Sequence, residues 1–163
     1  LMERMKPLEN EFKLKKSGTG ALWITPVYSY KFTHTKKVLQ PGQPTYSTHS
    51  IENKGDDQPL RFIITAVDES VSGIRIELNG AKTLEFPITL EKGQTLKYTE
   101  GSEAVLYDNH WQIVRKIPVN TSLLHCTAGK QQVLVDARFE GTNEAPKLKL
   151  EFLFFGPAEK LEK

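Results

Sequence analysis

The sequence predicts an all-β protein, specifically an antiparallel β-sandwich of jelly-roll type. Roughly nine short segments rich in β-branched and aromatic residues follow one another between residues 21 and 155. Turn-forming residues separate these segments at intervals of about ten residues, as in β-sandwiches. No apolar pattern of helical period interrupts them, which excludes architectures built from β-α-β units.

The predicted strands begin with ALWITPVYSYKF at 21–32, where Pro26 indicates an edge or a bulge. The run LRFIITAV at 60–67 is almost continuously apolar, as expected of a strand covered on both faces. GIRIELNG at 73–80 alternates between apolar and polar residues. The remaining predicted strands are 84–90, 95–98, 104–108, 112–119, 131–141 and 147–155, and YSTHSI at 46–51 predicts one more within the weakly patterned region 33–59.

The opening segment is the only one whose apolar residues follow a helical period. They recur at spacings of four, three and four, and Pro7 limits the helix to a short piece. The apolar stripe indicates either a linker that packs on a preceding domain or a terminal helix that folds back on the sheet. We therefore divide the chain into a linker or terminal helix (1–19), a β-sandwich domain (20–157) and a tail (158–163). The stripe consists of Leu1, Met5, Leu8 and Phe12.

Composition narrows the class of partner. The 163 residues suffice for one domain, and the net charge of +2 with scattered lysines does not favour nucleic acid. No apolar run reaches the roughly 18 residues of a membrane-spanning helix. The single cysteine, Cys126, is expected to be a buried, inert thiol, because the neighbouring His125 would point to the opposite face of a strand.

No motif of catalysis or cofactor binding is present, and we expect no cofactor. The sequence lacks GxSxG, Walker, GxGxxG and HExxH motifs. His34 and His49 flank the long loop and could converge on a metal, although solvated histidines are the commoner outcome. In ENKGDDQP (52–59), the acidic residues beside Asn53 suggest a structural calcium site, but without EF-hand spacing, so a solvated turn is the preferred interpretation.

The hairpin at 101–119 carries the clearest candidate for ligand binding. Asp108, Asn109 and His110 form its turn, and Trp111 begins the return strand. Sugar-binding surfaces combine a flat aromatic ring with a few polar partners, and this turn offers both. The preferred interpretation of Trp111 is nevertheless a lid that folds back over the end of the core, with the exposed aromatic platform as the alternative.

Three runs carry a resemblance to a known family: LEKGQTLKY at 90–98, AVLYDNHW at 104–111 and KLKLE at 147–151. With them, residues 73–155 resemble the C-terminal β-sandwich domains attached to glycoside hydrolases of Bacteroidetes-type gut bacteria. The opening segment is similar to the linker that joins such domains to a catalytic barrel. The resemblance implies an accessory module of galactose-binding-like architecture in a secreted or periplasmic polysaccharide-degrading protein. It brings no catalytic residue, since the acid and base of such enzymes lie on the preceding domain.

Three hypotheses follow. The first is a non-catalytic accessory module that binds a polysaccharide or oligosaccharide. Its contacts would be Trp111, Asp108, Asn109 and His110, with Trp23 and Tyr30 as a second patch. The second is a structural module that packs against a catalytic domain of the same parent chain. The third is a stand-alone jelly-roll enzyme or adhesin, which would require a convergent cluster such as His34, His49 and Asp57.

Overall fold

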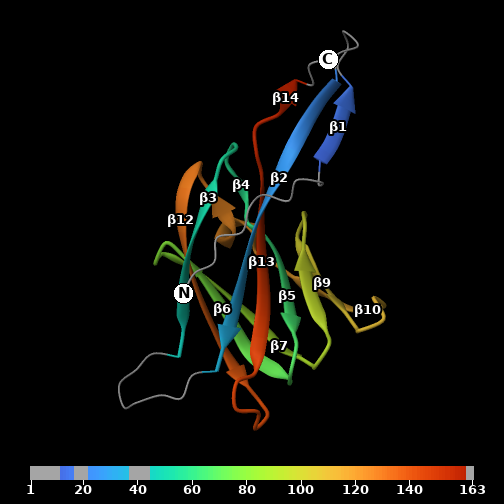
Figure 1. The fold of residues 1–163 in the computed structure, drawn as a ribbon, viewed down its shortest axis with the longest axis vertical. Coiled ribbons are helices and arrows are strands. Elements are labelled where there is room, and N and C mark those ends of the chain that lie inside the picture. Colours follow the sequence, from blue (N-terminus) through green and yellow to red (C-terminus); the bar gives the residue numbers. More distant parts are fainter. Residues whose placement is uncertain (1–11, 17–21, 37–44, 161–163) are drawn as a thin grey trace.

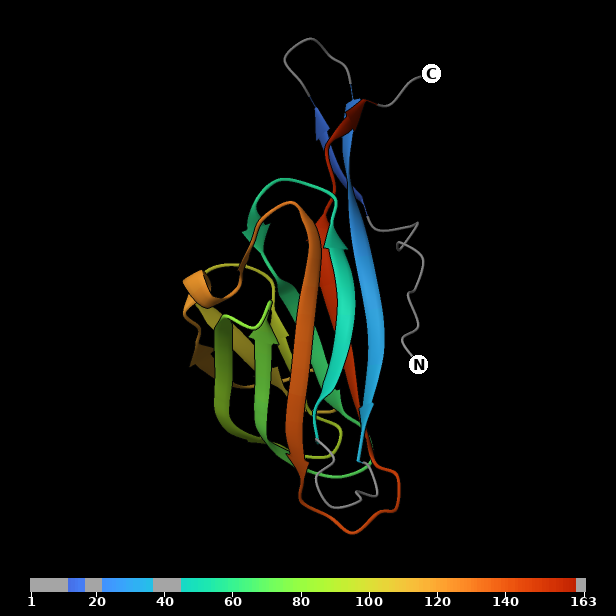
Figure 2. The ribbon, with the colours of Figure 1, turned by 90° about the vertical axis from the view of Figure 1, so that its left-hand side faces the viewer.

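The computed structural model describes residues 12–16, 22–36 and 45–160, and it confirms the all-β prediction (Figure 1). The strands pair antiparallel throughout and form two facing layers, which are seen edge-on in Figure 2. The described residues contain no α-helix, only one turn of 3₁₀-helix, η1 (Thr121–Leu123). None of the described residues lie in a helix with the length and apolar character needed to cross a bilayer.

The two layers are an eight-stranded and a four-stranded sheet, with a short two-stranded ladder at one end. The larger sheet has the order β1 (Phe12–Lys16), β2 (Leu22–Thr35), β13 (Lys147–Phe155), β5 (Arg61–Ala66), β8 (Thr95–Tyr98), β9 (Glu103–Tyr107) and β10 (Ile113–Pro118), and β14 (Glu159–Lys160) pairs with β2. The smaller sheet has the order β3 (Ser47–Asn53), β12 (Gly129–Phe139), β6 (Val71–Leu78) and β7 (Lys82–Leu90). The two-stranded ladder pairs β4 (Gln58–Pro59) with β11 (His125–Cys126).

This strand order is that of a jelly roll. The main sandwich consists of β2, β13, β5 and β8 facing β3, β12, β6 and β7. Counted as eight strands in chain order, one sheet runs 1-8-3-6 and the other 2-7-4-5, which is the arrangement of two interlocked Greek keys. The hairpin β9–β10 extends the larger sheet at the edge beyond β8. It is an addition to the eight strands that make up the jelly roll.

The core fills the space between the two layers with alternate residues of each strand. Phe62 in β5 meets Phe86 in the opposite sheet at 5.3 Å between ring centroids and stacks on Tyr98 at 5.6 Å. The expectation that the run 60–67 is covered on both faces is wrong. Ile63 and Thr65 are only half-buried, because the outer face of β5 carries no second layer.

The first part of β2 leaves the sandwich and forms a projecting arm with β1 and β14 (Figures 1 and 2). Pro26 marks the point of departure, where β2 passes from its pairing with β13 to its pairing with β14. This position agrees with the predicted interruption at Pro26. Phe12, expected to end the helical stripe, instead begins β1. Leu1, Met5 and Leu8 lie outside the described residues.

Candidate binding site

The tip of the β9–β10 hairpin is closed by hydrogen bonds to Asp108. Its backbone N–H donates to the carbonyl of Gln112 (2.9 Å), and its own carbonyl accepts from the N–H of Trp111 (3.1 Å). Its carboxylate Oδ1 also accepts from the N–H groups of His110 (2.8 Å) and Gln112 (2.9 Å). An aspartate that bonds its own backbone in this way defines the turn locally.

The same contacts determine the charge of Asp108. The backbone N–H of Gln112 lowers the pKa of this carboxyl below its ordinary value, and the N–H of His110 adds to the effect. Hydrogen bonds donated to the ionised form favour that form. Asp108 is therefore negatively charged at neutral pH and remains a hydrogen-bond acceptor within the turn.

Trp111 lies on the surface, and the interpretation of this residue as a lid over the core is wrong. Its side chain is 65% exposed, and its backbone has a φ of 60°. A left-handed backbone is uncommon for a bulky residue and occurs where the surrounding structure imposes it. The indole meets the Tyr107 ring edge-on, with 5.8 Å between centroids. One aromatic ring thus supports another that is open to solvent.

The structure brings together the four residues predicted at this turn. Asn109 and His110 are exposed beside Trp111 and Asp108. The Cβ of Asn109 would lie 3.2 Å from a Cβ at Gly93, so the tip also rests against the β7–β8 turn. The hairpin tip therefore lies close to a second turn.

The second predicted patch does not form beside the first. Tyr30 is 3% exposed, and its hydroxyl donates to the carbonyl of Glu52 (3.1 Å), so it belongs to the core. Trp23 lies in the part of β2 that pairs with β1 and β14 in the arm. Four strands separate β2 from β10 in the sheet order. The prediction that Tyr30 contacts a ligand at the surface is therefore wrong. Trp23 lies in the arm, away from the hairpin tip.

A hollow of about 330 Å³ begins at Tyr107 and follows the outer face of β8, β9 and β10. Its lining includes Val105, Lys97 and Lys116, and Glu103 borders it at the β8–β9 end. Sequence reasoning did not identify these residues as part of a site. The only sequence pattern that involves these residues is their alternation with buried residues on three strands. The sequence does not reveal that those strands are neighbours, so it could not predict the hollow.

A larger, open depression of about 1020 Å³ lies at the other end of β9. Its polar groups are largely engaged, since the Tyr98 hydroxyl donates to the Gly101 carbonyl (2.9 Å) and Lys82 Nζ to the His125 carbonyl (3.1 Å). Tyr98 is the one aromatic residue among those that line the depression, and it is 1% exposed. This depression offers a sugar ring no aromatic face, in contrast to the hairpin tip.

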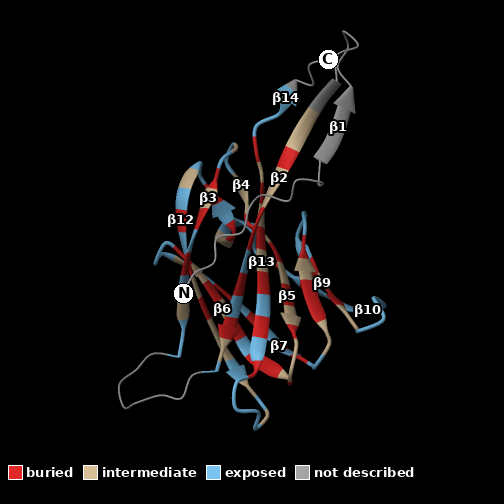
Figure 3. Cartoon of the chain, viewed as in Figure 1, coloured by how far each residue is buried: buried red, intermediate tan, exposed pale blue. Residues whose placement is uncertain are grey.

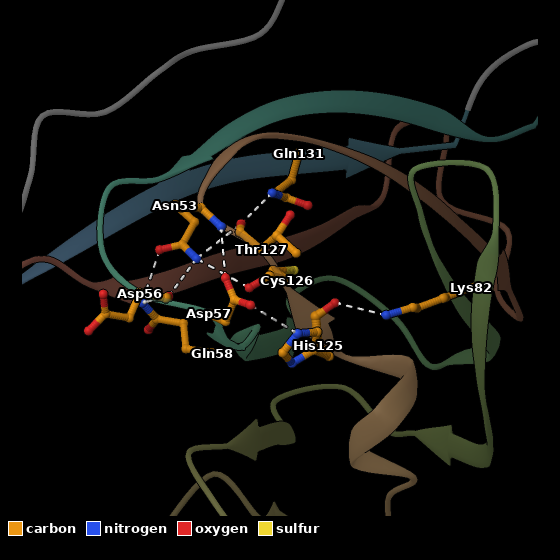
Figure 4. Close-up of polar contacts among 10 residues, drawn as sticks. Asn53, Asp56, Asp57, Gln58, Lys82, His125, Cys126, Thr127 and Gln131 are labelled. Carbon is orange, nitrogen blue, oxygen red and sulfur yellow. Dashed lines mark hydrogen bonds and ion pairs between the residues drawn. The ribbon is translucent and has the colours of Figure 1, made fainter.

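The densest polar cluster surrounds Asn53, near that depression (Figure 4). Asn53 is 1% exposed, and its Nδ2 donates to three carbonyl oxygens, of which those of Asp56 (2.9 Å) and Thr127 (3.1 Å) are the nearest. Its Oδ1 accepts from the Gly55 N–H and from Gln58 Nε2, both at 3.0 Å. Every hydrogen-bonding position of the amide serves the two loops that close this end of the sandwich.

These contacts bear on the suggested calcium site. Calcium requires several oxygen atoms that converge on one point. The side-chain oxygen of Asn53 instead faces N–H donors. Asp57 accepts from the Ala128 N–H (3.3 Å) and lies 3.7 Å from His125 Nε2. Across the described ranges, no group of three or more His, Cys, Asp or Glu residues is arranged to hold a metal ion.

His34 and His49 do converge, but inside the protein. They are 1% and 6% exposed, so the preferred interpretation as solvated histidines is wrong. The hydroxyl oxygen of Ser47 lies 2.8 Å from His34 Nδ1 and 3.0 Å from His49 Nε2. Asp57 follows the end of β3, and the last residue of that strand, Asn53, is already about 13 Å along the strand from His49. The cluster of His34, His49 and Asp57 required by the third hypothesis is therefore not assembled.

Cys126 has the environment predicted from the sequence. It is 1% exposed, and burial raises the pKa of its thiol to about 11. His125 is exposed on the opposite side of the strand. A protonated thiol that faces away from the imidazole is not a nucleophile with a base.

Comparison of the chain with protein-family models, with curated proteins and with solved structures found no match. The chemistry of the hairpin tip therefore carries the functional argument.

Proposed function

We propose that this chain is a non-catalytic jelly-roll module that binds a polysaccharide through the tip of the β9–β10 hairpin. The exposure of Trp111 supports the proposal, because an indole that is 65% exposed and held by a closed turn can stack on a sugar ring. Asp108, Asn109 and His110 surround it with groups that can orient hydroxyls. The family resemblance adds the context of a secreted or periplasmic carbohydrate-active enzyme in which this module accompanies a catalytic domain.

The test is a fluorescence titration with plant and host oligosaccharides, both neutral and acidic. The background is Trp23→Phe, which leaves Trp111 as the sole tryptophan. We expect a saturable change in emission at micromolar to millimolar ligand, and loss of binding in Trp111→Ala measured by calorimetry. Tyr46→Ala is a matched control, because Tyr46 is also an exposed aromatic but directly precedes β3, away from the hairpin.

The loss of binding in Trp111→Ala is informative only if this variant folds as the wild type does. Because Trp111 is largely exposed, Trp111→Ala should alter the free energy of unfolding by less than about 0.5 kcal/mol. If no oligosaccharide perturbs Trp111 or binds the wild-type chain, the proposal is wrong.

One observation favours a structural module as the second candidate. Ile113 and Val114 in the edge strand β10 are 58% and 48% exposed, and Figure 3 shows β10 largely in the colour of exposed residues. Such a surface on an edge strand is typical of a contact with another protein. In this case no oligosaccharide would bind the chain, and Val114→Asp would weaken association with the neighbouring domain of the parent protein.

A further inference from the structure

The outer face of the larger sheet aligns lysines from separate strands in adjacent rows. The strand registers place Lys31, Glu151, Ile63, Lys97, Val105 and Lys116 side by side across β2, β13, β5, β8, β9 and β10. In the next row, Lys149 and Tyr107 stand on the same face. We call Lys31, Lys97, Lys116 and Lys149 the lysine face.

The lysines have carboxylates nearby but none in direct contact: Glu100 and Glu103 line the hollow with Lys97 and Lys116, and Glu151 stands beside Lys31. Within the described ranges, no carboxylate lies within 4.0 Å of an amine of the lysine face. Glu151, the acidic residue in the row, accepts a hydrogen bond from Ser29 Oγ (2.7 Å). The outer face of the smaller sheet differs, because Arg75 there pairs with Asp136 at 3.7 Å. The four lysines outnumber the three carboxylates beside them, so this part of the larger sheet keeps a small excess of positive charge.

The lysine face is continuous with the hairpin tip. Trp111 contacts Tyr107, and Tyr107 lines the hollow that also contains Lys97 and Lys116. The distance from β8 to β10 is two strand spacings, and that from β2 to β8 is three, so Lys31 and Lys116 are separated by roughly 24 Å. An extended ligand could lie across the strands, with one ring on Trp111 and its following units above the lysines.

We propose that the ligand of this module is an acidic polysaccharide, whose carboxylate or sulfate groups lie over the lysine face while one of its rings stacks on Trp111. This inference rests on the proposed glycan binding at the hairpin tip. A lysine ammonium acts as a flexible point charge and accepts either anionic group. Nucleic acid fits less well, because its phosphates are closely spaced and four separated lysines can contact few of them.

The experiment compares ligands of equal length on the wild-type chain and on Lys97→Gln/Lys116→Gln. The ligands are a neutral oligoglucan, an oligogalacturonate, a sulfated oligosaccharide and single-stranded DNA. We expect an acidic ligand to bind more tightly than the neutral one, and the double variant to lose about tenfold in affinity for it alone. Added salt should weaken acidic binding only, because screening acts on charge pairs. The preferred acidic ligand identifies carboxylate or sulfate as the recognised group.

Two further variants strengthen the test. Lys130→Gln is the matched control, since Lys130 is exposed on the smaller sheet, and it should change nothing. Glu103→Gln should raise affinity for the acidic ligand by removing a repulsive charge at the border of the hollow. Equal binding of neutral and acidic glycans, unaffected by the lysine variants, would overturn the inference and leave the proposed function intact. If the wild-type chain binds no glycan at all, both the inference and the proposed function are wrong. If it binds DNA more tightly than any glycan, the choice of an acidic polysaccharide as ligand is wrong.

Discussion

At the β9–β10 turn, one carboxylate organises the main chain around the exposed indole. Asp108 accepts from two backbone N–H groups, and the chain continues into Trp111 with a φ of 60°. The backbone cost of that conformation for a bulky residue is offset by hydrogen bonds within four residues. The backbone conformation at Trp111 is therefore a local property of the turn, whereas its exposure follows from the place of the hairpin at the edge of the sheet.

We expect the order of this turn to depend on pH. Because hydrogen bonds lower the pKa of Asp108 in the folded protein, its contribution to stability is fully present above the ordinary carboxyl value of about 4. The contribution is lost as the pH falls below that value and through the lower pKa of the folded state. Trp111 emission in the Trp23→Phe background should report the change as the pH is lowered through this range. Asp108→Ala should give a flat profile there, and an unchanged transition in that variant would contradict the assignment.

Among the elements, the β3–β4 turn depends on one buried amide. Asn53 joins its own loop to the segment that leads from β11 into β12, through donors and acceptors on both. Its environment has low exposure, so a lost hydrogen bond would leave buried backbone groups without partners. The sequence analysis singled out segment 52–59 for its carboxylates, but in the structure the side-chain amide of Asn53 organises the segment.

Replacement of Asn53 should therefore be costly. We expect Asn53→Ala to lower the free energy of unfolding by about 2–4 kcal/mol, because several buried polar groups lose their partner at once. Urea denaturation measures this change. Asn109→Ala is the control, since Asn109 is exposed and should be nearly neutral. Similar stabilities for the two variants would show that Asn53 does not organise the turn.

The β6–β7 hairpin shows how much a local signal can predict. Asn79 and Gly80 have φ values of 54° and 68°, as the turn signal NG in the sequence indicates. The Asn79 side chain also accepts from the Gln132 N–H in the neighbouring strand (2.8 Å). The turn was predictable because its backbone requirement is local, whereas the contact with β12 was not.

For the whole molecule, stability comes from the layer between the two sheets. Phe152 belongs to β13, the strand between β2 and β5, and is completely buried. Its ring centroid lies 6.2 Å from that of Phe32. The adjacent Leu153 points to the outer face and is half-buried. Core residues from both sheets form one cluster, so the sandwich should unfold as a unit.

We expect Phe152→Ala to destabilise the protein by about 3–5 kcal/mol, because it removes a fully buried ring from a close-packed core. The thermal transition should shift downward and remain single. Leu153→Ala, one position along the strand, should cost clearly less. Two separate transitions would show that the sheets do not fold cooperatively.

The candidate site was predictable only in part. The hairpin residues Asp108 to Trp111 are contiguous, so the sequence was enough to place them together. Lys97 and Lys116 come from different strands, and only the register across β8, β9 and β10 brings them to one face. Tyr30 was assigned to the surface because alternation along β2 defines two faces without indicating which one is buried.

The all-β class, the positions of most strands and the sharp turns could be predicted from the sequence, because strand alternation and turn chemistry act over a few residues. The tertiary structure was needed to establish which strands pair, that Trp111 is exposed and that lysines of separate strands form one face. These properties depend on which strands become neighbours and which end of the core a loop covers. Both are set by contacts between residues far apart in the chain, and local patterns do not encode them individually.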